Sequence, residues 1–240
     1  MPALSLVFLL IGLTHTEVWV QGNAAFRAGD YDTAVVRYRE LLAAGVDDGE
    51  VYYNLGNAEF RRGQLAAALA AFRAAQARLP RNEDVAQNLR LARAQVKDAV
   101  RFPEPAAALQ ALFFWHYDLS WRELLAAVAV VNVLLWALVP AALYWRRRGW
   151  RWAAIALALL LAALLPSTVI RWWWPTTVAI VHAASLDVFS GPGEGAALRF
   201  RLHEGTEASV TGTDGDWVRL ALSDGNQGRA KASDLLVVRL

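Results

Sequence analysis

One eight-residue segment occurs twice in this sequence, at a fixed spacing. Residues 22–29 read GNAAFRAG and residues 56–63 read GNAEFRRG, so the two copies start 34 residues apart. The spacing continues beyond them, because Tyr38 and Phe72 are also one period apart. A repeat of this length predicts stacked helix–turn–helix units, each of which needs its neighbour to cover its apolar face.

The second copy carries a longer pattern that resembles the tetratricopeptide repeat. The residues that carry the resemblance are Tyr52, Leu55, Gly56, Ala68, Phe72, Ala75 and Pro80. The small residues Gly22 and Gly56 allow the two helices of each unit to approach closely. We therefore expect α-helical tetratricopeptide repeats over residues 17–98, in which residues 83–98 form a capping helix at the open end of the stack.

The first helices of these units present a candidate protein-binding groove on the concave side of the repeats. In peptide-binding members of the tetratricopeptide family, asparagines at this position hold a ligand backbone or terminal carboxylate, and neighbouring arginines would add charge-assisted hydrogen bonds. The alternative is that these side chains only pack helices together or face solvent. The candidate residues are Asn23, Phe26, Arg27, Tyr53, Asn57, Phe60 and Arg61.

Two uncharged apolar stretches follow the repeats. Residues 124–145 and 152–170 comprise 22 and 19 residues, and each is long enough to cross a bilayer as a helix. The short separator, residues 146–151, contains four arginines. Residues 123–171 therefore predict a transmembrane helical hairpin whose tip faces the cytoplasm. Within it, Asn132 is expected to bond to Ser167 or to a partner helix.

The N-terminal residues agree with that orientation. Residues 3–13 are apolar and uncharged, which is typical of an export signal. Residues 1–16 therefore predict a signal peptide or an uncleaved N-terminal anchor. Residues 99–122 are expected to be a linker and an interfacial segment, with an aromatic cluster at 113–117. The predicted localisation is a bacterial inner membrane, with multiple passes and with the N- and C-terminal domains in the periplasm.

Residues 176–240 contain short β-prone runs separated by turn residues, which predict a small, curved β-barrel. This part resembles a bacterial SH3 domain and is expected to be an SH3-like β-barrel. The resemblance rests on residues 186–192, Gly205-Thr206, Trp217-Val218, Asp224-Gly225 and Gly228.

No pattern of residues points to an enzyme. The sequence has no cysteine, and its histidines do not lie at metal-ligand spacing. It contains neither a Gly-x-Ser-x-Gly elbow nor a Walker loop. The acidic residues Asp30, Asp32, Asp47 and Asp48 are expected at helix starts, where the helix dipole favours them. We expect no catalytic residue, cofactor, metal or small-molecule substrate, and a net charge of +2 gives no reason to expect a nucleic-acid partner.

The order of these parts along the chain resembles the BatE-type proteins of bacterial aerotolerance operons. That resemblance implies a membrane-anchored, periplasm-facing scaffold that binds von Willebrand-A-type membrane partners, beside a MoxR-type ATPase, in envelope stress tolerance. The alternative is a cell-wall module in which the SH3-like domain binds peptidoglycan and the repeats dock a wall-remodelling enzyme. Both hypotheses make the chain a binding protein in contact with a lipid bilayer.

Overall fold

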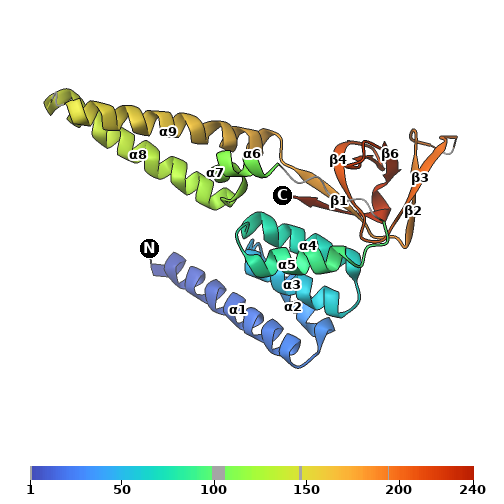
Figure 1. Cartoon of the computed structure of the whole chain (residues 1–240). Coiled ribbons are helices and arrows are strands. Elements are labelled where there is room, and N and C mark those ends of the chain that lie inside the picture. The colour runs from blue at the N-terminus through green and yellow to red at the C-terminus, as the bar shows by residue number, and fades with distance from the viewer. Residues whose placement is uncertain (1, 99–105, 146–147, 194) are drawn as a thin grey trace. The chain divides into compact units, whose positions relative to one another are not determined.

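A computed structural model of the chain describes residues 2–98, 106–145, 148–193 and 195–240 (Figure 1). The chain divides into two compact units. One unit contains the N-terminal helices α1 to α5 together with all the strands, and the other contains helices α6 to α9.

Five helices form the repeat region as consecutive antiparallel neighbours, and they confirm the predicted helical repeats. The first helix continues through residue 16 without a break, so the apolar N-terminal segment and the first repeat share one helix. The last helix ends at Arg93, five residues before the predicted end of the capping helix at residue 98. The bounds are α1 (Pro2–Arg27), α2 (Tyr31–Ala43), α3 (Gly49–Arg61), α4 (Leu65–Arg78) and α5 (Glu83–Arg93).

Local sequence explains where these helices begin. The Asp30 carboxylate accepts a hydrogen bond from the Thr33 N–H at 3.0 Å, and Asp48 does the same for the Glu50 N–H at 2.8 Å. These bonds satisfy N–H groups that have no partner within the helix. The prediction that Asp30 and Asp48 stand at helix starts is therefore confirmed.

The repeated glycines bring paired helices into close contact. A Cβ atom added at Gly56 would lie 2.6 Å from the ring of Phe72, and one added at Gly22 would lie 2.9 Å from the ring of Tyr38. Both rings are almost fully buried, with exposed fractions of 1%. Each glycine therefore provides the space that the aromatic ring of the facing helix occupies, and the predicted close approach of the two helices of each unit is confirmed.

The C-terminal region is one seven-stranded antiparallel sheet in the order β3-β2-β6-β5-β4-β1-β7. Because β3 and β7 lie at opposite ends of this order, the sheet is not closed into a barrel, and the predicted SH3-like barrel is not confirmed. The peptidoglycan-binding alternative, which depends on that barrel, stays a prediction. The strands are β1 (Thr177–Val181), β2 (Ser185–Phe189), β3 (Leu198–His203), β4 (Glu207–Asp214), β5 (Trp217–Ala221), β6 (Gln227–Lys231) and β7 (Leu235–Arg239), with a 3-10 turn η1 (Ala232–Asp234) before β7.

The sheet packs directly against the repeats. Val178 and Ile180 of β1 are fully buried in one apolar cluster with Leu69 of α4 and Leu89 of α5. β1 and β7 thus cover the end of the stack beside α5, where the described residues contain no second helix of a third repeat. This burial provides the cover that a terminal repeat needs.

A buried ion cluster accompanies this packing. The Glu207 carboxylate accepts hydrogen bonds from Arg73 at 2.7 Å and from Arg93 at 3.0 Å. The side chains of Glu207 and Arg73 are only 5% and 9% exposed. Since an ion buried without a partner costs several kcal/mol, each of these charges depends on the others.

A second polar contact joins the end of the helical region to the sheet. Asp98 accepts hydrogen bonds from the backbone N–H of His203 at 2.7 Å and from the Thr206 hydroxyl. Burial raises the pKa of the Asp98 carboxyl, but these hydrogen bonds outweigh it and leave the pKa below its usual range. Asp98 is therefore ionised at neutral pH and holds the β3–β4 turn.

The other unit consists of two short helices and two long ones, α6 (Ala107–Leu112), α7 (Phe114–Tyr117), α8 (Trp121–Trp145) and α9 (Arg148–Trp173). Both long helices are long and apolar enough to cross a membrane. They pack as a pair through Leu124, Val131 and Leu164. The predicted 99–105 part of the linker and the arginines 146–147 lie outside the described residues.

Polar and aromatic groups of this unit meet next to the aromatic cluster at 113–117. The Arg171 guanidinium donates hydrogen bonds to the backbone carbonyls of His116 and of Leu119, the latter at 2.9 Å. The rings of Trp121 and Trp172 are stacked 6.3 Å apart.

Asn132 is exposed on the surface of α8 whereas Ser167 is buried, and no bond joins them in the described part of the chain. Ser167 is therefore not the partner of Asn132, and the other expected partner, a partner helix, stays a prediction.

Candidate polypeptide-binding groove

Two asparagines of the predicted site take part in equivalent hydrogen bonds between repeats. The Asn23 side-chain oxygen accepts a bond from the Asn54 amide at 3.2 Å, and the Asn57 oxygen accepts one from the Asn88 amide at 2.7 Å. Both pairs are 31 residues apart in the chain, so the same contact repeats along the stack. These bonds show that the asparagines help to hold successive repeats together.

The two asparagines differ in their second neighbour. The oxygen of Asn23 also accepts a bond from the Tyr38 hydroxyl at 2.8 Å. Burial raises the pKa of Tyr38 to about 12, so this hydroxyl keeps its proton at neutral pH. One period later the equivalent residue is Phe72, which has no hydroxyl group. Among the described residues, Asn57 therefore has one fewer hydrogen-bond partner than Asn23.

A groove of about 250 Å³ lies beside Asn57. Four of the seven predicted residues contribute to its lining, and the structure adds Phe72, Asn88 and Leu91. The four predicted residues are Phe26, Asn57, Phe60 and Arg61. The groove therefore draws on α1, α3, α4 and α5, which span both repeats and the helix that follows them.

Aromatic contacts hold the rim at the start of the groove. The Phe26 ring meets the Tyr31 ring edge to face, with ring centres 5.5 Å apart. The Arg61 guanidinium lies over the same Tyr31 ring at 5.9 Å, a cation–π distance. Arg61 remains exposed at the surface, so its charge is available to a ligand.

The remaining three predicted residues lie outside the lining. The Asn23 side-chain oxygen already accepts hydrogen bonds from Tyr38 of α2 and Asn54 of α3. Arg27 is exposed on α1. The Tyr53 hydroxyl accepts a hydrogen bond from the Asn88 amide at 3.2 Å, so Tyr53 orients a residue of the groove without lining it.

Sequence reasoning missed Asn88 as a groove residue. The signal was present, because Asn88 follows Asn54 by the repeat period of 34 residues. Leu91 follows Asn57 by the same 34 residues, so it occupies the position equivalent to the two asparagines. Its side chain is 53% exposed and contributes apolar surface at the far end of the groove.

This set of residues can bind a polypeptide segment. An amide side chain can pair with a peptide backbone group, a guanidinium can pair with a carboxylate, and the aromatic and leucine side chains can cover apolar residues. Among the described residues, no group of three or more histidine, cysteine or carboxylate side chains could hold a metal ion. The arrangement thus offers binding groups and no metal centre in the described ranges.

Comparison with known families identifies the repeats. Residues 20–83 match the family model of the tetratricopeptide repeat. The match begins within α1, covers α2, α3 and α4, and stops at the start of α5. A sequence comparison with curated proteins finds no match. Tetratricopeptide repeats indicate a protein–protein interaction scaffold in general, because stacked helix pairs create an extended concave binding surface.

Proposed function

We propose that this chain is a membrane-anchored scaffold whose tetratricopeptide groove binds an extended segment of a partner protein. The observation that carries the proposal is the groove of about 250 Å³ around Asn57 and Arg61. It combines a half-buried amide, an exposed guanidinium and the apolar side chains of Phe26, Phe60 and Leu91. The proposal gives the chain no catalytic role.

The hydrogen-bonding capacity of Asn57 supports a ligand backbone in the groove. Its oxygen accepts a hydrogen bond from Asn88, whereas its amide nitrogen has no hydrogen-bond partner among the described residues. A backbone carbonyl of a bound segment would accept from that nitrogen. Arg61 would then pair with an acidic side chain or a terminal carboxylate of the same segment, which favours an acidic ligand.

The membrane anchor is proposed to be the α8–α9 hairpin. Each helix contains a long apolar stretch and carries large hydrophobic side chains on its outer surface, such as Trp136, which is 68% exposed. The sequence places arginines at 146–148 and 151, and the positive-inside rule puts such a tip in the cytoplasm. The chain entering α8 and the chain leaving α9 would then both be periplasmic.

The proposed partners follow from the resemblance to BatE-type proteins. That resemblance favours von Willebrand-A-type membrane proteins as partners, with a MoxR-type ATPase in the same system and a role in aerotolerance. A groove on the periplasmic side would suit a ligand segment from the periplasmic part of such a membrane protein.

Arg61 and Arg27 provide a matched test, because they occupy equivalent positions one period apart and only Arg61 lines the groove. We expect Arg61→Ala to lower partner affinity by roughly tenfold, since a hydrogen bond to a charged group contributes about 1.5–3 kcal/mol. Arg27→Ala should retain the partner. The measurement is quantitative affinity purification of the full chain from detergent-solubilised membranes, at equal expression. Equal partner recovery from both variants would contradict the proposal.

A further inference from the structure

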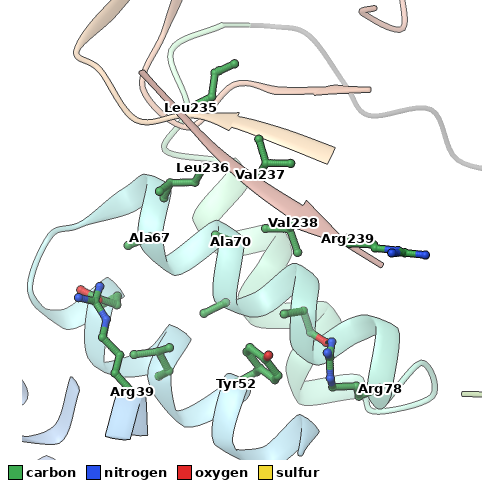
Figure 2. Close-up of a pocket in the computed structure, with 14 residues that line it drawn as sticks. Arg39, Tyr52, Ala67, Ala70, Arg78, Leu235, Leu236, Val237, Val238 and Arg239 are labelled. Atoms are coloured by element: carbon green, nitrogen blue, oxygen red, sulfur yellow. The ribbon is translucent and has the colours of Figure 1, made fainter. Parts of the chain in front are cut away.

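A second groove lies on the edge of the sheet, along β7. It has a volume of about 450 Å³ and runs between β7 and the helices α2, α3 and α4 (Figure 2). Its floor is made of small side chains, Ala67, Ala70, Ala71 and Ala74 of α4. Because β7 is the last strand of the sheet, β1 is its one strand partner among the described residues.

The hydrogen-bond pattern of β1 determines which backbone groups of β7 face outward. The Val181 N–H bonds to Thr206 at 3.0 Å, which directs Val181 toward β4, and the His182 N–H bonds to Asp234 at 2.9 Å, which directs His182 toward β7. Backbone groups alternate along an antiparallel strand. Leu236 and Val238 therefore bond to β1.

The backbone groups of Leu235, Val237 and Arg239 point away from β1 as a result. The Leu235 N–H is already bonded to the Ala232 carbonyl. Val237 is the central residue of the strand, and within the described part of the chain its outward N–H and carbonyl form no hydrogen bond. Its side chain is 51% exposed. The edge thus has a free donor and a free acceptor at its centre.

The charges around this groove have a net positive sign. Three arginines and one glutamate line it, namely Arg39, Arg78, Arg239 and Glu59. Arg39 pairs with Glu59, and Arg78 pairs with Asp47 outside the lining. Arg239 is exposed at the end of β7. Figure 2 shows Arg78 and Arg239 toward one end of the groove and Arg39 toward the other.

We propose that the β7 edge binds an extended acidic segment of a partner protein, which adds to the sheet as a further strand. The backbone of the segment would pair with Val237 and Arg239, and its acidic side chains would meet the arginines at the two ends. Small or apolar side chains between them would cover the alanine floor. This site is separate from the tetratricopeptide groove, and the inference does not depend on the function proposed for that groove.

Charge favours an acidic partner over a second copy of this chain. Pairing of two β7 edges would bring a second Arg239 and its neighbouring arginines to a surface that already has excess positive charge. Like charges across such a contact are destabilising. An acidic strand would instead be attracted to the net positive charge of the groove, most strongly at the end where Arg239 lies.

The probe is a fluorescein-labelled heptapeptide with glutamates at both ends and valine and threonine between them. A second peptide with lysines in place of the glutamates is the control. Each is titrated against the detergent-solubilised full chain by fluorescence anisotropy. We expect saturable binding of the glutamate peptide and at least about tenfold weaker binding of the lysine peptide, since two charge-assisted contacts are lost.

Val237→Pro removes the outward N–H without removing a bond to β1, and proline is tolerated on an edge strand. It should weaken binding of the glutamate peptide about tenfold. Val237→Thr, which keeps the N–H, should bind the same peptide as tightly as wild type. Arg239→Glu tests the charge independently of the backbone and should reduce the preference for the glutamate peptide. An unchanged thermal midpoint verifies that each variant is folded.

Three results would overturn the proposal. The first is equal binding of the glutamate peptide by wild type and Val237→Pro. The second is equal binding of both peptides by wild type. The third is concentration-dependent self-association of the wild-type chain in sedimentation that Val237→Pro abolishes, because the edge would then be occupied by a second copy.

Discussion

Glu207→Gln is expected to lower the free energy of unfolding by about 3–5 kcal/mol, the cost of breaking a buried ion pair by removing one partner. Glutamine keeps the size of the side chain but not its charge. The guanidinium groups of Arg73 and Arg93, 2.7 and 3.0 Å from the carboxylate, would then lose their shared anion. Because Glu207 belongs to β4 and the arginines belong to α4 and α5, the loss should separate the sheet from the repeats.

Guanidinium denaturation of the detergent-solubilised full chain, followed by circular dichroism, measures the free energy of unfolding of wild type and Glu207→Gln. Hydrogen–deuterium exchange should also accelerate in β1 and β7, which lie against the helices. Asp187→Asn is the matched control, because Asp187 pairs with Arg201 at 2.6 Å on the exposed surface of the same sheet. We expect no resolvable change from this control, since exposed pairs are screened by solvent. Equal losses from both variants would show that burial of the Glu207 cluster does not matter.

Phe72→Ala is expected to lower the free energy of unfolding by about 3–5 kcal/mol, as for other buried phenylalanines truncated to alanine. The ring is 1% exposed and fits against Gly56, where even a Cβ atom would lie 2.6 Å away. Tyr53 packs beside it, with ring centres 6.3 Å apart. The surrounding helices are held on the other side by Ile180 of the sheet, so the cavity cannot collapse easily.

Leu91→Ala is the control for this truncation. Leu91 is 53% exposed at the surface of α5, so its loss should change the free energy of unfolding by no more than about 0.5 kcal/mol. Both variants are measured by the same denaturation experiment. If Phe72→Ala lowered the free energy of unfolding as little as Leu91→Ala does, the close packing of α3 against α4 would be contradicted.

The helical repeats could be predicted because their signals are local and periodic. Gly56 and Phe72 each recur one period from Gly22 and Tyr38, and Asp30 and Asp48 mark helix starts. Such signals depend on residues only a few turns apart, which is why the number and order of the helices followed from the sequence.

The sheet was harder to predict because its pairing is not local. Five of its strands carry β-prone runs, but β6 (Gln227–Lys231) has a single apolar residue, Ala230, and is defined by its pairing with β5. β3 alternates leucine and phenylalanine with arginine, and this alternation was overlooked. Whether the strands close into a barrel depends on contacts between the first and last strands of the sheet, which no short segment encodes.

The same limit applied to contacts between distant residues. Arg73 and Glu207 are separated by 134 residues, so nothing in the sequence joins them. In the candidate groove, the repeat period correctly predicted Asn57 and Arg61 as lining residues. It also predicted Asn23, which does not line the groove. The difference arose from the hydroxyl group of Tyr38, a contact that only the folded helices reveal.

Site-specific photo-crosslinking tests the proposed groove most directly. A benzophenone amino acid replaces Leu91 in the groove and, as control, Val36 on α2, which is 61% exposed and lines neither groove. In living cells the account predicts a discrete crosslinked partner from position 91, strongly reduced by Arg61→Ala, and none from position 36. Equal crosslinking from the two positions, or crosslinking at 91 that Arg61→Ala leaves unchanged, would contradict it.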